Sequence, residues 1–221
     1  MSRTVCITGA TGYLGRALSA ALSARGHTVR ALVRPGGTAR AAPGVEAREL
    51  DVFDADALSA AFAAGDTVVH LIGTPHPNPS KAAEFQRVDL GSARICAAAA
   101  ARVGVAHLVY VSVAQPAPMM HAYVAARAAA EAAIGAAGLT ATFVRPWYVL
   151  GPGHRWPYLL LPFYRAAELV PSMRDSARRL GLVTLAQMTR ALVVAAENPP
   201  PAGTRRVVDV PAIRAAGGDA A

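Results

Sequence analysis

Lysine and cysteine are almost missing from this sequence. Lys81 is the only lysine among 22 basic residues, and Cys6 and Cys96 are the only cysteines. Two cysteines within regular structure, without a metal-type spacing, predict reduced thiols and no metal site. No apolar run reaches the about 20 residues that a membrane-spanning helix needs, and a strand-like run (RTVCIT) begins at residue 3. We therefore expect a cytoplasmic protein with no signal peptide and no membrane span.

Acidic residues are also few, 14 against 22 basic ones, and the formal charge is +8. A basic stripe would favour nucleic-acid binding. The arginines are scattered singly, however, and their excess accompanies an excess of alanine, which is typical of a coding bias. Basicity without a recognition motif is weak support for such a partner, so we expect no nucleic acid.

Regular alternation organises the first two thirds of the chain. The length of 221 residues and the hydrophobic content of 53% suit one domain with a sizeable core. We predict strands at 3–8, 28–33, 45–50, 67–72, 107–113 and 140–145, and helices at 12–25, 55–63, 80–103 and 121–137. Strands separated by helices of this length predict a parallel sheet with right-handed crossovers. The predicted fold class is α/β, a doubly wound parallel sheet of the Rossmann type.

The composition changes after Arg145. Residues 146–183 open with a stretch rich in Pro, Trp, Tyr and Leu, and we expect them to form a short irregular cap. Residues 184–213 are expected to return to the sheet, through a helix at 184–197 and a strand at 205–210. The tail after Pro211 is expected to fray. One domain, with this cap, would then span residues 1–221.

A glycine-rich turn, TGATGYLG at residues 8–15, joins the first strand to the first helix. Gly9 permits the tight turn, Gly12 lets a pyrophosphate approach the backbone, and Gly15 permits close packing of helix on strand. The helix N-terminus adds free N–H groups and a positive dipole. The turn therefore predicts a dinucleotide site, since it lies between a strand and a helix.

The spacing of these glycines resembles the short-chain dehydrogenase/reductase family, especially its extended and atypical members. The resemblance covers about residues 1–153 and, more loosely, 181–213. Further matching segments are ELDVFDADAL, VVHLIGT, FQRVDLGSARICAAAA, HLVYVSV and VRPWYVLGPG. The resemblance implies a single NAD(P)-binding Rossmann domain, with Asp51 beside the adenine, the segment at His70 under the cofactor, and the Arg-Pro loop near the nicotinamide. The predicted cofactor-binding residues are Gly9, Thr11, Gly12, Tyr13, Leu14, Gly15, Arg34, Asp51, Val52, Leu71, Ile72, Gly73, Arg127 and Pro146.

The end of the second strand bears on the choice of cofactor. An acidic residue there would bind the ribose 2′-hydroxyl of NAD, but the strand ends ALVRPGG with Arg34. Arg34, helped by Arg16 or Arg40, suits a 2′-phosphate through forked hydrogen bonds. A solvent-facing arginine in an arginine-rich protein is the alternative. We predict NADP, with NAD still open.

Three residues carry the predicted chemistry. The resemblance implies that Tyr123 exchanges the substrate proton and that Ser112 orients the carbonyl. Arg127 stands where relatives have a lysine, and Asp89 where they often have asparagine. An arginine keeps a cation near Tyr123 and can donate to ribose, but it cannot release a proton. We expect slow turnover, lost in Tyr123→Phe and kept or raised in Arg127→Lys.

The cap supplies the predicted substrate residues Trp147, Tyr148, His154 and Trp156. Its aromatic character favours a small apolar substrate, although each aromatic alone suits simple packing as well. The leading interpretation is an NADP(H)-dependent oxidoreductase acting on an apolar carbonyl or alcohol. The alternative is a non-catalytic NADP(H)-binding redox sensor or assembly factor, which Arg127 favours. A sugar epimerase or dehydratase is a weaker third option, and the oligomeric state stays open, with a homodimer as one option.

Overall fold

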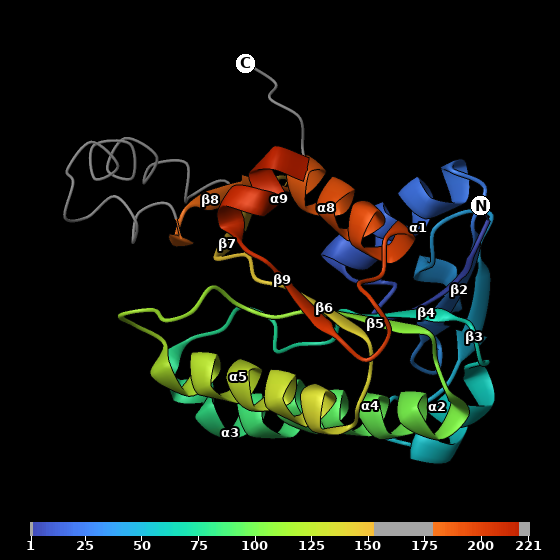
Figure 1. The fold of residues 1–221 in the computed structure, drawn as a ribbon, viewed down its shortest axis with the longest axis horizontal. Coiled ribbons are helices and arrows are strands. Elements are labelled where there is room, and N and C mark those ends of the chain that lie inside the picture. The colour runs from blue at the N-terminus through green and yellow to red at the C-terminus, as the bar shows by residue number, and fades with distance from the viewer. Residues whose placement is uncertain (1, 153–178, 217–221) are drawn as a thin grey trace.

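A single parallel sheet of seven strands forms the centre of the molecule (Figure 1). The computed structural model describes residues 2–152 and 179–216. The elements are, in chain order, β1 (Thr4–Thr8), α1 (Tyr13–Ala24), β2 (Thr28–Val33), η1 (Thr38–Arg40), β3 (Glu46–Glu49), α2 (Ala55–Ala61), β4 (Thr67–His70), η2 (Pro79–Lys81), α3 (Ala82–Glu84), η3 (Phe85–Leu90), α4 (Gly91–Val103), β5 (His107–Val111), α5 (His121–Ala136), β6 (Ala141–Val144), β7 (Tyr148–Leu150), β8 (Leu182–Thr184), α8 (Leu185–Glu197), β9 (Arg205–Val208) and α9 (Val210–Ala216).

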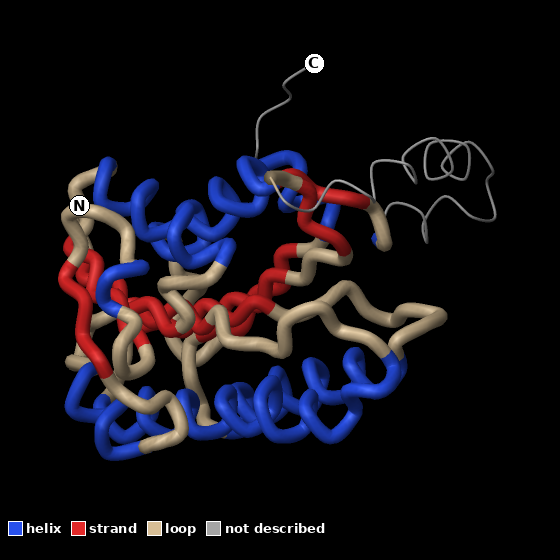
Figure 2. The backbone as a smooth tube through the Cα atoms, turned by 180° about the vertical axis from the view of Figure 1, so that it is seen from behind, coloured by secondary structure: helices blue, strands red, loops and turns tan. Residues whose placement is uncertain are grey.

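The strand order of the main sheet is β3-β2-β1-β4-β5-β6-β9, and every neighbouring pair is parallel. Helices α1, α8 and α9 cover one face, and α2, α3, α4 and α5 cover the other (Figures 1 and 2). The order reverses between β1 and β4, so the chain leaves these strands toward opposite faces. In such sheets ligands bind outside the carboxyl ends of the strands at this reversal. The predicted fold class is confirmed.

Two apolar layers hold the helices to the sheet. One joins β1 to α1, α8 and α9 through residues such as Ile7, Leu22, Leu192 and Ile213. The other joins the opposite face to α2, α4 and α5 through residues such as Leu58, Leu108 and Ile134. The central strands read as continuous apolar runs because both of their faces are buried.

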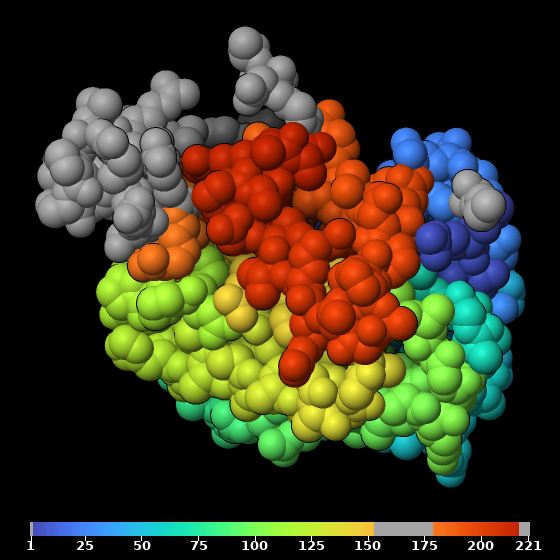
Figure 3. All heavy atoms as spheres, in the orientation of Figure 1, coloured from blue at the N-terminus to red at the C-terminus, as the bar shows by residue number. Residues whose placement is uncertain are grey.

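The C-terminal segment rejoins the body of the protein. Helix α8 begins with a capping box, in which the Thr184 hydroxyl accepts from the Gln187 N–H and the Gln187 side chain accepts from the Thr184 N–H. Strand β9 then adds to the edge of the sheet beside β6. In the space-filling view these residues, orange to red, cover the middle of the visible face (Figure 3).

Three details differ from the sequence prediction. The tail after Pro211 was predicted to fray, and for residues 212–216 this is wrong: helix α9 runs to Ala216, because Val210 and Ile213 are fully buried against the core. The predicted helix at 80–103 is interrupted by the π-helical turn η3 before α4. Within the predicted cap, β7 and β8 pair as a small parallel sheet, and residues 153–178, with His154 and Trp156, lie outside the described residues.

Candidate cofactor-binding and active site

The glycine turn is built so closely that side chains are excluded from it. Gly9 has φ +74°, and a Cβ there would lie 3.3 Å from the Leu71 carbonyl carbon. A Cβ on Gly15 would overlap the Gly9 oxygen and come within 2.6 Å of the Ala10 Cα. The Gly12 N–H donates to the Gly9 oxygen at 3.0 Å, which closes the turn. Close backbone contacts thus require glycine at positions 9 and 15, while the Gly12 N–H holds the turn closed.

The first turn of α1 opens directly from this loop. Gly12 is the N-cap residue and has no side chain to cap the helix. The first orphan N–H groups of α1 therefore remain available to a ligand, and the helix dipole is positive at this end. Thr11, Tyr13 and Leu14 flank the turn and are half-buried.

The end of β4 lies beside the glycine turn, although about sixty positions separate them in sequence. The Leu71 N–H donates to the Thr8 oxygen at 3.2 Å, and a Cβ on Gly9 would contact Ile72 at 3.4 Å. Leu71, Ile72 and Gly73 are half-buried. The structure therefore brings the predicted phosphate turn and the predicted segment under the cofactor together at the sheet reversal.

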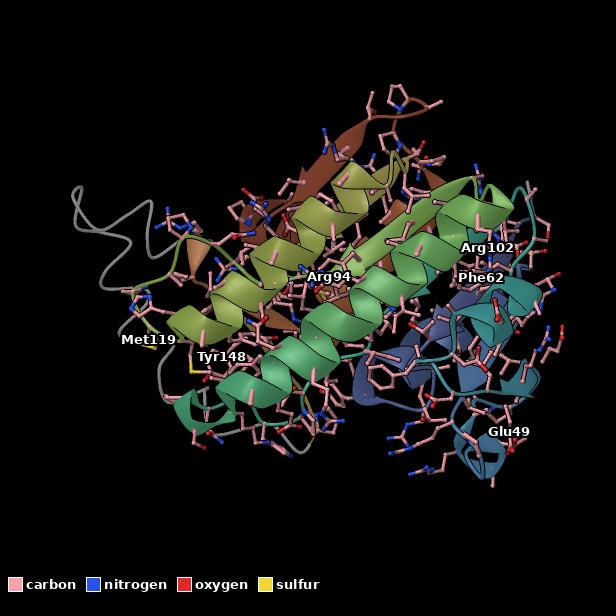
Figure 4. All side chains as sticks on the ribbon, turned by 90° about the horizontal axis from the view of Figure 1, so that it is seen from below. Glu49, Phe62, Arg94, Arg102, Met119 and Tyr148 are labelled. Atoms are coloured by element: carbon pink, nitrogen blue, oxygen red, sulfur yellow. The ribbon has the colours of Figure 1, made fainter. Side chains whose placement is uncertain are left out.

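The end of β2 exposes Arg34 and lies next to a carboxylate. Glu49, at the end of β3, pairs in register with Val33 and accepts a hydrogen bond from the Thr38 hydroxyl at 2.7 Å. This bond, and then the Gly36 backbone N–H, hold the pKa of Glu49 below its ordinary value. Glu49, labelled in Figure 4, thus binds the loop that follows Arg34 at the edge strand of the sheet. The sequence prediction looked for an acidic residue only on the second strand and missed it.

The predicted adenine side follows β3. Asp51 is exposed and accepts a hydrogen bond from the Phe53 N–H at 2.9 Å, while Val52 is half-buried. These residues continue the same carboxyl edge that carries the glycine turn and Arg34. An adenine in this position would meet Asp51 and Val52 at the surface of the protein and not in its core.

A buried histidine supports the floor of the site. His70 contacts the Thr8 hydroxyl at 2.8 Å through Nδ1 and the Ser92 hydroxyl at 3.1 Å through Nε2. Burial, and then the nearby Arg127 charge, lower the pKa of His70 to about 3. The imidazole is therefore neutral near pH 7 and joins β1, β4 and α4 through hydrogen bonds.

Arg127 is buried in the middle of the site. Its Nη2 pairs with Asp89 Oδ1 at 2.6 Å, and its Nη1 donates to the Val111 oxygen at 2.8 Å and to the Tyr110 hydroxyl at 3.2 Å. Burial opposes the charge, but the two tyrosines and Asp89 outweigh it and raise the pKa of Arg127. Burial also raises the pKa of Tyr110 to about 12. Arg127 is a permanent cation held by several partners.

The two other predicted catalytic residues flank this cation. Tyr123 is half-buried, its ring centroid lies 5.3 Å from Arg127 Cζ, and it packs on Phe85 at 5.0 Å between centroids. Ser112 follows the Val111 carbonyl that Arg127 contacts. Its hydroxyl is buried and has no hydrogen-bond partner among residues 2–152 and 179–216. An unpartnered buried hydroxyl costs stability unless a ligand or water satisfies it.

The predicted substrate residues that the structure describes lie after β6. Pro146 before them, which was predicted to bind the cofactor, is buried, and its oxygen accepts from the Ala114 N–H at 2.9 Å. Trp147 and Tyr148 pack edge to face, with centroids 6.0 Å apart, and Tyr148 is 36% exposed. A cleft of about 420 Å³ is lined by Ala114, Gln115, Arg145, Arg179, Val207, Asp209 and Pro211. Its lining includes two arginines and an aspartate, so it is more polar than the predicted substrate wall.

Comparison with known proteins identifies the family and the fold. A family model for NAD(P)H-binding proteins matches residues 9–155. The chain belongs to this NAD(P)H-binding family. The fold is similar to that of a UDP-N-acetylglucosamine 4-epimerase structure from Bacillus cereus. That structure has a TM-score of 0.68 at 19% identity, covering 94% of this chain and 78% of the other.

Two curated relatives of this family member are oxidoreductases by name. A ceramide reductase of Caulobacter vibrioides is 31% identical over 179 residues, which is 79% of this chain and 55% of that protein. An L-arabinose 1-dehydrogenase (NAD(P)(+)) of Haloferax volcanii is 34% identical over 108 residues, 49% of this chain and 40% of that protein. The chain thus spans about half the length of the curated relatives it matches.

The residues present fit the nicotinamide cofactor that the family implies. The turn at Gly9, Gly12 and Gly15 is a cradle from which side chains are excluded, and uncapped N–H groups of α1 face it. The unpartnered Ser112 hydroxyl offers a further polar group. In the part of the chain that the structure describes, no helix has the length and apolar character needed to cross a bilayer.

Besides Glu49, two further residues of the site were missed or left without a role by sequence reasoning. Tyr110 lies in the middle of an apolar strand and gave no signal, yet its hydroxyl contacts Arg127. Asp89 was noted only as a departure from relatives, yet it is Arg127's ionic partner. An acidic residue in a predicted helix, on the same face as apolar residues, was the signal that could have indicated a buried partner for Asp89.

Proposed function

We propose that this chain is an NADP(H)-dependent oxidoreductase acting on an apolar carbonyl or alcohol. One observation carries the proposal: the single buried guanidinium of Arg127 lies against the ring of Tyr123 and binds the backbone carbonyl that precedes Ser112. Such fixed charge at a reacting centre is the usual basis of enzymatic stabilisation.

The residues divide the chemistry among them. When bound, the cofactor supplies or accepts the hydride. The glycine turn and the N-terminus of α1 would hold its pyrophosphate, and the neighbouring Leu71, Ile72 and Gly73 would contact it. In the direction of reduction, a C–H bond forms at the carbonyl carbon, and the C=O π bond opens. Tyr123 gives its phenolic proton to the oxygen, and Ser112 donates a hydrogen bond that orients it.

A lipid-like carbonyl is the substrate class we propose. The aromatic pair Trp147 and Tyr148 after β6 supports an apolar substrate. The relative named ceramide reductase also supports it, since the name describes action on a lipid. The relative named L-arabinose 1-dehydrogenase makes a sugar the competing substrate class.

The test is a turnover assay on two matched proteins. NADPH oxidation is measured for the native chain and for Tyr123→Phe, with long-chain ketones, short aldehydes and sugars as substrates. We expect turnover of an apolar carbonyl by the native chain and a loss of about 10²–10⁴-fold in the variant. Calorimetry is expected to give equal NADPH affinity for both proteins, because the ring that packs on Phe85 is retained.

The second candidate is a non-catalytic NADP(H)-binding protein. The observation that favours it is the same Arg127, whose contacts with Asp89, Val111 and Tyr110 differ from those of a titratable lysine. Tight NADPH binding without turnover of any substrate in the panel would support this candidate over the enzyme.

A further inference from the structure

Asp89 is the most deeply buried carboxylate near the site. Its side chain has no exposed surface, and it binds three groups from two other segments. Oδ1 pairs with Arg127 Nη2 at 2.6 Å, while Oδ2 accepts from the Thr74 N–H at 3.1 Å and from the Thr74 hydroxyl at 2.6 Å. One carboxylate therefore joins α5 to the segment that follows β4.

The segment after β4 is also pressed directly against the guanidinium. A Cβ on Gly73 would overlap Arg127 Nη2, so a side chain there would have to displace the guanidinium from its partners. Gly73 and Thr74 continue the Leu71–Ile72 segment that lies beside the glycine turn. A shift of Arg127 would therefore move the backbone on which the proposed cofactor rests.

Helices η3 and α5 contact each other here through two pairs of residues with the same spacing. Phe85 and Asp89 are four positions apart in η3, and Tyr123 and Arg127 are four positions apart in α5. Phe85 packs on Tyr123 at 5.0 Å between centroids, and Asp89 pairs with Arg127. The π-helical turn presents both side chains to α5, and such turns occur often at functional sites.

We propose that Asp89 is a positioning residue: it holds Arg127 under Tyr123 and fixes the Gly73–Thr74 turn at the cofactor. Arg127 is then a stationary cation and takes no part in proton transfer. This inference rests on the proposed function, because it assigns the Gly73–Thr74 turn to a bound NADP(H). Beyond that function, the inference names Asp89 as the ionic partner on which the proposed NADP(H) site depends.

The proposal changes what Arg127→Lys is expected to do. Sequence reasoning predicted that lysine would keep or raise turnover. One ammonium nitrogen replaces two guanidinium nitrogens, however, and these now reach Asp89 on one side and Val111 and Tyr110 on the other. We expect Arg127→Lys to lower turnover, and Arg127→Lys combined with Asp89→Asn to lower it further.

The first experiment compares two buried carboxylates. Asp89→Asn removes the partner of Arg127. Asp66→Asn is the control, because Asp66 is also buried and pairs with Arg30 at 3.4 Å, but it precedes β4 at the opposite edge of the sheet. Thermal unfolding and NADPH affinity by calorimetry are measured for both. We expect both variants to melt earlier, and only Asp89→Asn to bind NADPH more weakly, by about ten- to a hundredfold.

A double variant separates positioning from mere stability. Asp89→Asn with Arg127→Met removes both buried charges, so no uncompensated charge is left. We expect its melting temperature to recover relative to Asp89→Asn, while NADPH affinity and turnover stay low. Full recovery of NADPH affinity and turnover would overturn the proposal, since the Asp89–Arg127 pair would then serve only the stability of the fold.

Thr74→Val covers the case in which Asp89→Asn does not fold. It keeps the ion pair and removes only the hydroxyl bond to Asp89, and we expect several-fold weaker NADPH binding. Unchanged binding in Thr74→Val, or equal losses in Asp89→Asn and Asp66→Asn, would contradict the positioning role. If the native chain binds neither NADPH nor NADH, the proposed function itself fails, which is a different result.

Discussion

Gly12 and Gly15 stand three positions apart in one turn, but the structure gives them different tasks. Gly15 is buried, and a Cβ there would overlap backbone atoms of Gly9 and Ala10. Gly12 is exposed, has extended backbone angles, and a Cβ would approach only the Gly9 oxygen, at 3.1 Å. Gly15 is therefore needed for the fold, whereas Gly12 mainly keeps the helix N-terminus open to a ligand.

Gly12→Val is expected to keep the fold and to lose the cofactor. The side chain would stand over the first N–H groups of α1, and each lost charged hydrogen bond is worth about 1.5–3 kcal/mol. Calorimetry should show at least a roughly hundredfold loss of NADPH affinity, with a circular dichroism spectrum like that of the native chain. Gly15→Val should instead fail to fold. Unchanged affinity in a folded Gly12→Val variant would place the site elsewhere.

Arg34→Asp is expected to reverse or erase a preference for NADP over NAD. Arg34 is exposed at the end of β2, and a forked contact to a 2′-phosphate should favour NADP by about 1–3 kcal/mol. Arg94→Asp, which makes the same charge change on the exposed face of α4 (Figure 4), should leave the preference intact. Equal native affinity for both cofactors would refute this assignment, and the nearby Glu49 would then be the residue to test.

At the scale of elements, burial decides which segments become regular. The residues after Pro211 have no strong helix signal, but Val210 and Ile213 face the apolar layer beneath α8. Contact with that layer stabilises a helix that is too short to be stable alone. In η3 packing instead interrupts a predicted regular helix: its backbone forms a wider π-helical turn, and Phe85 and Asp89 both contact α5.

Ile213→Ala tests the contribution of α9. The side chain is fully buried, so its truncation should destabilise the protein by about 2–5 kcal/mol. Val194→Ala on α8 is the matched control, because Val194 is 44% exposed and should cost well under about 1 kcal/mol. Urea unfolding measures both. A small loss in Ile213→Ala would mean that α9 does not support the core.

At the scale of the whole molecule, two buried histidines link stability to pH. Burial, followed by the Arg127 charge, lowers the pKa of His70 to about 3. Burial, followed by the Arg206 and Arg3 charges, lowers the pKa of His107 to about 4. Below their ordinary value of 6.5 the unfolded chain binds two protons that the folded chain does not. Stability should therefore be full above that pH and fall as the solution becomes more acidic.

Below pH 6.5 the free energy of unfolding is expected to fall by about 1.4 kcal/mol per pH unit for each histidine. Urea unfolding between pH 7.5 and about 5 would measure it, above the range in which carboxylates titrate. His107→Gln should remove about half of the slope, whereas His121→Gln, which replaces an exposed histidine, should keep it. A flat profile would show that these histidines are protonated in the folded chain.

The sequence by itself determined the sheet, the glycine turn and the family, because these depend on local periodicity and on contacts within a few residues. The buried runs from Thr4 to Val144 alternate with helical stretches, and Gly9, Gly12 and Gly15 carry their spacing in one turn. Such features need no knowledge of distant neighbours.

Only the tertiary structure decided how the site is charged and closed. Arg127 obtained its partner from Asp89, 38 positions earlier, through the packing of η3 on α5. A side chain at position 73 would displace that same guanidinium, and Glu49 binds Thr38 in the loop after Arg34 because β3 pairs with β2. The Arg127–Asp89 pair joins segments far apart in the chain, and burial turns it from a weak surface contact into a fixed one, whereas the Glu49–Thr38 bond stays exposed.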